Sequence, residues 1–137
     1  FGQKELKKYD WVAMGIEKTF YWNSGAETTL ILEGQTILNA SKEERANLDV
    51  FQKDILFGIR HNLNDVMGSE FLLSAITDLE REKEHLMSFE YKRRLSSNWK
   101  AGIGLKVIEA PQKDLIPKGL EFSHEKNELN LKLTRFF

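Results

Sequence analysis

Trp99-Lys-Ala-Gly-Ile-Gly-Leu-Lys-Val107 is the stretch of sequence that decides the fold. Its odd-numbered positions are all apolar, whereas its even-numbered positions hold only lysine and glycine. Because successive side chains of a β-strand point to opposite faces, this alternation predicts a strand with one apolar face and one polar face.

The same alternation recurs along most of the chain. It covers residues 8–22, 27–38, 54–63, 69–79, 85–95, 99–107 and 128–134. Most of these segments are close to the ~9–11 residues that a tilted strand needs to cross a bilayer. The sequence therefore predicts an all-β fold, an antiparallel up-and-down transmembrane β-barrel segment of about seven strands that occupies residues 1–137.

Residues 69–95 also fit an amphipathic helix. Apolar residues recur there at spacings of three and four, and Glu80-Arg-Glu-Lys-Glu84 consists of good helix formers. We favour two strands because the segments on either side alternate so regularly. A helix over these residues is the alternative.

The connections between the predicted strands alternate in kind. Residues 23–25, 64–68 and 96–98 are short and polar, whereas residues 39–50, 80–84 and 111–127 are long or highly charged. Outer-membrane barrels show this asymmetry, with tight periplasmic turns and longer external loops. The pattern predicts that all short turns lie at one edge of the sheet.

The composition excludes several classes of protein. The 137 residues suit one domain, and the net charge of −1 argues against a nucleic-acid binder held by bulk electrostatics. No apolar run approaches the ~20 residues that a membrane helix needs. Cysteine is absent, which excludes disulfides and zinc–thiolate sites.

Motifs of catalysis are missing. The three histidines, His61, His85 and His124, are scattered without metal-ligand spacing, and no serine lies in a glycine-flanked nucleophile elbow. The sequence therefore predicts no catalytic residues, no metal, no cofactor and no enzymatic activity.

The last residues resemble a known kind of strand. Leu129-Asn-Leu-Lys-Leu-Thr-Arg-Phe-Phe137 is similar to the C-terminal strand of bacterial outer-membrane β-barrels, in which apolar residues alternate back from a terminal aromatic residue. Arg135 departs from that pattern. The resemblance implies that the barrel assembly machinery binds the strand that ends at Phe137.

Four further stretches resemble a group of proteobacterial outer-membrane proteins of unassigned biochemical role. They are Gly15-Ile-Glu-Lys-Thr-Phe-Tyr21, Phe51-Gln-Lys-Asp-Ile-Leu-Phe-Gly-Ile-Arg60, Leu63-Asn-Asp-Val66 and Glu90-Tyr-Lys-Arg-Arg-Leu95. In that group this region is the C-terminal part of a longer barrel. The resemblance implies the outer membrane of a Gram-negative bacterium, with lipid and lipopolysaccharide as surroundings.

A barrel of this kind assigns the two strand faces to water and to lipid. The candidates for the water-filled lumen are Glu17, Glu33, Arg60, Asp78, Glu90, Lys92, Arg94, Lys100, Lys106 and Lys132. The candidates for the lipid face are Ile55, Phe57, Ile59, Phe89, Ile103, Leu105, Val107, Leu131 and Leu133. The candidates for aromatic residues at the membrane interfaces are Trp22, Phe71, Trp99 and Phe137 at the periplasmic ends and Trp11 and Phe51 at the external ends.

The function expected from these features is a porin-like passive channel or a structural barrel without catalysis. The lumen charges would then set ion preference, and the external loops would set access. One alternative is a soluble β-barrel or β-rich module that binds an apolar ligand. Another is an outer-membrane enzyme whose active site lies upstream of this segment.

Overall fold

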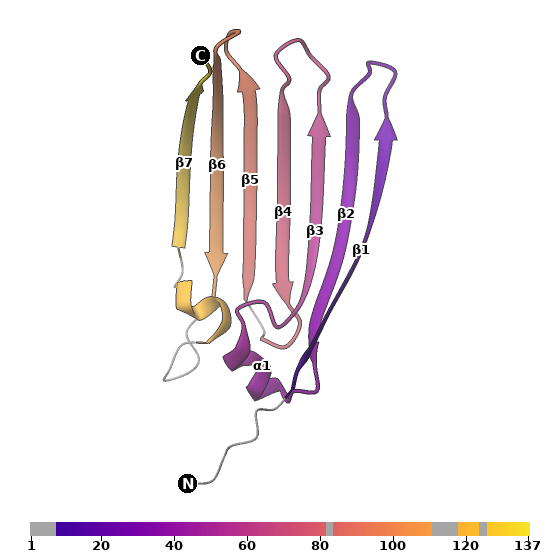
Figure 1. The fold of residues 1–137 in the computed structure, drawn as a ribbon, viewed down its shortest axis with the longest axis vertical. Coiled ribbons are helices and arrows are strands. Elements are labelled where there is room, and N and C mark those ends of the chain that lie inside the picture. The colour runs from indigo at the N-terminus through magenta and orange to yellow at the C-terminus, as the bar shows by residue number, and fades with distance from the viewer. Residues whose placement is uncertain (1–7, 82–83, 111–117, 124–125) are drawn as a thin grey trace.

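The computed structural model describes residues 8–81, 84–110, 118–123 and 126–137. Seven strands form one antiparallel sheet in which every strand pairs with its neighbours in sequence (Figure 1). The strands are β1 (Asp10–Tyr21), β2 (Glu27–Leu38), β3 (Lys53–Asn62), β4 (Glu70–Asp78), β5 (His85–Arg94), β6 (Trp99–Glu109) and β7 (Lys126–Arg135). The predicted all-β, up-and-down fold is confirmed. The sheet is open, with β1 and β7 at its two edges.

The region that also fitted a helix forms two strands. β4 and β5 pair antiparallel from Glu70 opposite Lys92 to Thr77 opposite His85. Each of these strands also pairs with its other neighbour, β3 or β6, so its backbone hydrogen bonds are satisfied within the sheet. The helical alternative for residues 69–95 is therefore wrong.

The structure also contains two short helices that the alternation does not predict. Helix α1 (Lys42–Leu48) begins with a capping box, in which the Ser41 hydroxyl accepts a hydrogen bond from the Glu44 amide and the Glu44 carboxylate accepts one from the Ser41 amide. The 3-10 helix η1 (Gly119–Ser123) precedes β7. Both lie within long connections.

The two ends of the sheet differ as the connections predict. The β1–β2, β3–β4 and β5–β6 turns and the C-terminus lie at one end, which we call the turn end (Figure 1). Helices α1 and η1 lie at the other, which we call the loop end. Gly25 is needed in the first turn, because its φ of +83° is a left-handed conformation that side chains disfavour.

The strand register separates two faces of the sheet. Residues directly opposite each other in an antiparallel pair lie on the same face, so the register can be followed from strand to strand. One continuous row on the apolar face is Ile16, Leu32, Phe57, Ala75, Met87 and Val107. The next positions along each strand form the polar face.

The apolar face is exposed. Ile16 keeps 69% of its surface accessible and Leu131 keeps 76%, and large apolar side chains of every strand are exposed in the same way. The small core instead lies on the polar side at the loop end, where Leu86, Ile108, Ala110 and Leu120 are buried. Sheet residues with apolar side chains therefore lie mostly outside the core.

Candidate functional site

The loop end of the polar face carries a cluster of polar side chains, most of them largely buried, which we call the loop-end cluster. Its members are Arg45, Gln52, Lys53, Asp54, Asp78, Glu80, Arg81, Glu84 and Glu121. They come from α1, from β3 and β4, from the connections beside these strands and from η1. Val50, Phe51 and Ile76 pack beside them against the small core.

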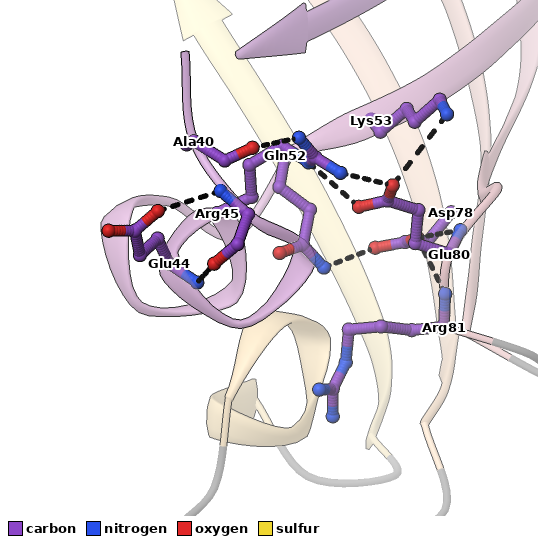
Figure 2. Close-up of polar contacts among 9 residues, drawn as sticks. Ala40, Glu44, Arg45, Gln52, Lys53, Asp78, Glu80 and Arg81 are labelled. Carbon is purple, nitrogen blue, oxygen red and sulfur yellow. Dashed lines mark hydrogen bonds and ion pairs between the residues drawn. The ribbon is translucent and has the colours of Figure 1, made fainter. Parts of the chain in front are cut away.

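Arg45 joins α1 to the connection between β4 and β5 (Figure 2). Its guanidinium donates to both carboxylate oxygens of Glu80, with Nη2 at 2.6 Å from Oε1 and Nε at 2.9 Å from Oε2. This hydrogen-bonded ion pair lowers the pKa of Glu80 and raises the pKa of Arg45. The contact therefore holds both groups in their charged forms.

Arg81 joins the same connection to η1. Its guanidinium pairs with Glu84, and its Nη2 lies 2.8 Å from Oε1 of Glu121. The other carboxylate oxygen of Glu84 accepts a hydrogen bond of 3.0 Å from the backbone amide of Leu120. Glu84 and Glu121 are almost wholly buried, so these bonds fix the position of η1.

Asp78 is the best-bonded carboxylate of the cluster. Its Oδ1 accepts hydrogen bonds from the backbone amides of Glu80 and Arg81, at 2.6 and 2.8 Å. Its Oδ2 accepts one of 2.8 Å from the side-chain amide of Gln52 (Figure 2). Asp54 lies directly opposite Asp78 on β3, and neither of its carboxylate oxygens has a hydrogen-bond partner among the described residues.

The ten candidate lumen residues all lie on the polar face according to the register. Charge is unevenly distributed over that face. Its acidic side chains on β1 to β4 are Glu17, Glu27, Glu33, Asp54, Glu70 and Asp78, and its basic ones on β5 to β7 are Lys92, Arg94, Lys100, Lys106, Lys126 and Lys132. Arg60, Glu90 and Glu128 are the charged residues that break this separation.

Of the ten candidates, only Asp78 lies in the loop-end cluster; the others are distributed along the face. Lys92 forms an ion pair of 2.5 Å with Glu70 across the β4–β5 pair. Sequence reasoning missed Asp54 as a site residue. The sequence did contain a signal for it. Asp54 and Asp78 are equally far in sequence from Val66, the centre of the β3–β4 hairpin, so antiparallel pairing places the two residues opposite each other.

The aromatic candidates occupy both ends of the sheet. Phe71, Trp99, Trp22 and Phe137 lie at the turn end. There Arg135 stands 5.6 Å from the ring of Trp99 and 4.9 Å from that of Phe137. The Arg135 guanidinium is therefore in cation–π range of two aromatic rings at this end.

The two candidates at the loop end differ from this arrangement. Trp11 lies directly opposite the buried Ile37, on the polar face, because its position in β1 has the parity of that face. Phe51 packs against the small core. Neither side chain therefore shares the apolar face with Trp99.

Other kinds of site are not formed by the described residues. No group of three or more His, Cys, Asp or Glu side chains is placed to hold a metal ion in that part of the chain. His61 contacts Thr28 at 2.7 Å and His85 contacts Thr77 at 3.3 Å, whereas His124 lies outside the described residues. No described helix has the length and apolar character to cross a membrane.

The loop-end cluster and the two contrasting faces are thus the features from which a function can be argued. They combine buried ion pairs that fix the long connections with an exposed apolar surface on the opposite side of the sheet. Comparison with known proteins finds no matching family model, no matching curated protein and no matching solved structure.

Proposed function

We propose that this chain forms part of the wall of a β-barrel in the outer membrane of a Gram-negative bacterium. The barrel is a porin-like passive channel or a structural barrel without catalysis. The observation that carries this proposal is the exposed apolar face, which extends over all seven strands opposite a polar face. An uncovered apolar surface of that extent is typical of a membrane or protein contact and not of a face in water.

The position of the small core supports the same assignment. A soluble β-sheet module buries its apolar face, and the polar face is then the one left in water. Here α1 and η1 lie by the polar face. Leu120 of η1 is buried with Leu86 and Ile108, and Val50 and Phe51, which follow α1, pack against them. Loops that fold inward over a polar lumen, with lipid on the outside, account for this arrangement.

The direction of the edge strands also bears on the proposal. Because the seven strands alternate in direction, β1 and β7 run the same way (Figure 1). Direct pairing of these two strands would therefore be parallel. Transmembrane barrels are antiparallel, and unpaired backbone is not tolerated in lipid. We therefore propose that the complete barrel contains an odd number of further strands between β1 and β7.

The charges on the polar face support a passive, water-filled or salt-bridged interior. Acidic residues of β1–β4 face the same side as basic residues of β5–β7. Mixed charge of this kind hydrates a lumen and tunes ion preference without selecting a particular substrate. Lipid and lipopolysaccharide would then surround the apolar face, and the assembly machinery would bind the strand that ends at Phe137.

Partition of the purified chain tests the membrane assignment. We expect it to require detergent for a monodisperse state and to insert into lipid vesicles with a β-type circular dichroism spectrum. A chain that is monodisperse in water without detergent would contradict the proposal and favour the soluble module that binds an apolar ligand. Conductance of the complete barrel in planar bilayers then separates an open channel from a closed structural barrel.

A further inference from the structure

Two buried carboxylates lie side by side at the loop end without a matching positive charge. Asp54 is 4% exposed, Asp78 is 5% exposed, and the register places them directly opposite each other on β3 and β4. Side chains in that relation have Cβ atoms about 4.5–5.5 Å apart, and like charges there repel. Something must compensate this repulsion if both groups are ionised.

Hydrogen bonds offset the cost of burying only one of the two carboxylates. Asp78 accepts three, from two backbone amides and the amide of Gln52. Asp54 accepts none from the described residues, although a buried carboxylate is costly unless it is paired or bonded. The amide oxygen of Gln52, a wholly buried residue, also lacks a partner there.

The charges of the loop-end cluster do not balance. Its carboxylates are Asp54, Asp78, Glu80, Glu84 and Glu121, and its cations are Arg45, Lys53 and Arg81. Arg45 and Lys53 both pair with Glu80, and Arg81 pairs with Glu84 and Glu121. No ion pair with Asp54 or Asp78 occurs among the described residues. The cluster as defined therefore has two more carboxylates than cations, and Asp54 and Asp78 are the two carboxylates without an ion pair there.

Space lies beside this pair. Gln35 is directly opposite Asp54 on β2, and its side-chain amide nitrogen donates to the carbonyl of Phe51. A hollow of about 380 Å³ is lined by Glu33, Gln35, Phe51 and Asp54. It provides room for water next to the carboxylate.

We infer that Asp54 and Asp78 together bind one hard divalent cation that retains part of its water shell. Two carboxylates are fewer than calcium sites usually supply, but Mg²⁺ binds through one or two carboxylates and keeps several waters. A bound dication would neutralise the two excess charges. It would also fix the β3–β4 pair at the point where the long connections fold over the polar face.

Titration of the full chain in lipopolysaccharide-free detergent with MgCl₂ tests this inference. Calorimetry is expected to show one saturable site, and thermal unfolding is expected to shift upward by several degrees relative to NaCl of equal ionic strength. Asp54→Asn and Asp78→Asn should each weaken Mg²⁺ binding at least tenfold. Glu17→Gln removes one acidic charge from the same face, away from the pair, and should leave binding unchanged.

A second readout keeps the test informative if Asp78→Asn fails to fold. Without divalent cations, Asp54→Asn should unfold at a higher temperature than the unsubstituted chain, because it removes the unbonded charge. Equal Mg²⁺ shifts in the unsubstituted chain and in Asp54→Asn, or no shift in either, would overturn the inference. A pair that shares a proton would give no Mg²⁺ response and would be stabilised by acid, which would also overturn it. None of these measurements depends on conductance or on membrane location.

Discussion

Arg45 donates hydrogen bonds to both carboxylate oxygens of Glu80, at 2.6 and 2.9 Å, across 35 residues of sequence. Both side chains are mostly buried, and the contact joins α1 to the connection between β4 and β5. A two-pronged contact of this kind depends on the flat guanidinium, which lysine cannot reproduce.

Loss of this contact should destabilise the protein. We expect Glu80→Gln to lower the free energy of unfolding by about 2 kcal/mol, because a buried charged donor is left with a weaker partner. Arg45→Lys should give a similar loss although it keeps the charge. Unfolding of both variants by denaturant measures the change in the free energy of unfolding.

An exposed ion pair provides the control for that experiment. Lys126 lies 2.9 Å from Glu128 near the start of β7, where the lysine side chain is largely in solvent. Lys126→Met should therefore change stability by only ~0–1 kcal/mol. Equal effects of Lys126→Met and Glu80→Gln would show that the buried contact has no special role.

Neighbouring residues of β7 should differ sharply in their tolerance of charge. Leu131 lies on the exposed apolar face, and Asn130 lies on the polar face. If the apolar face contacts lipid, Leu131→Lys should cost about 2–4 kcal/mol of folding in bilayers, as for a lysine near the membrane midplane. Asn130→Lys should cost much less. Similar unfolding curves in lipid vesicles for the two variants would count against a lipid-facing surface.

Tryptophan fluorescence should report the difference between the two ends of the sheet. Trp99 lies on the apolar face at the turn end, beside Arg135, whereas Trp11 lies on the polar face at the loop end. In single-tryptophan variants, brominated lipids should quench Trp99 strongly and Trp11 weakly. Stronger quenching of Trp11 than of Trp99 would mean that the faces are assigned the wrong way round.

The turn between β3 and β4 should depend on pH. The backbone amide and the hydroxyl of Ser69 donate to the carboxylate of Asp65, at 2.6 and 2.7 Å, and these bonds lower the pKa of Asp65 below its ordinary value of about 3.9. The stabilisation is therefore present above pH ~4 and is lost as the pH falls through the lowered pKa.

Hydrogen exchange can measure this dependence at the Ser69 amide. We expect its protection to fall on acidification below about pH 4, since a protonated Asp65 is a weaker acceptor. In Asp65→Asn the protection should be lower and should show no such transition. A transition that persists in Asp65→Asn would assign it to another group.

The strands could be predicted from the sequence because their side chains alternate with a period of two. Residues 27–38 have the bounds of β2, and the other predicted strands agree with the structure to within a few residues. The same alternation gave the two faces, since the register keeps the ten predicted lumen residues on one side. Local pattern was sufficient there because each strand pairs only with its neighbours in sequence.

The loop-end cluster could not be predicted in the same way. Arg45, Glu80 and Glu121 lie in connections that have no repeating pattern, and their contacts depend on how those connections fold over the polar face. Helix α1 was also missed, although Ser41 and Glu44 have the spacing of a capping box. Charge runs in loops are usually solvated, so nothing in their composition indicated burial.

The shared direction of the two edge strands restricts how identical copies of this sheet can assemble. Copies related by rotation about an axis along the strands would place β1 of one beside β7 of the next, and that seam would be parallel. An antiparallel seam between two β1 edges requires one copy to be upside down, with its α1 at the opposite end of the assembly. Repetition of this unit alone therefore cannot produce an antiparallel ring whose members all have the same orientation.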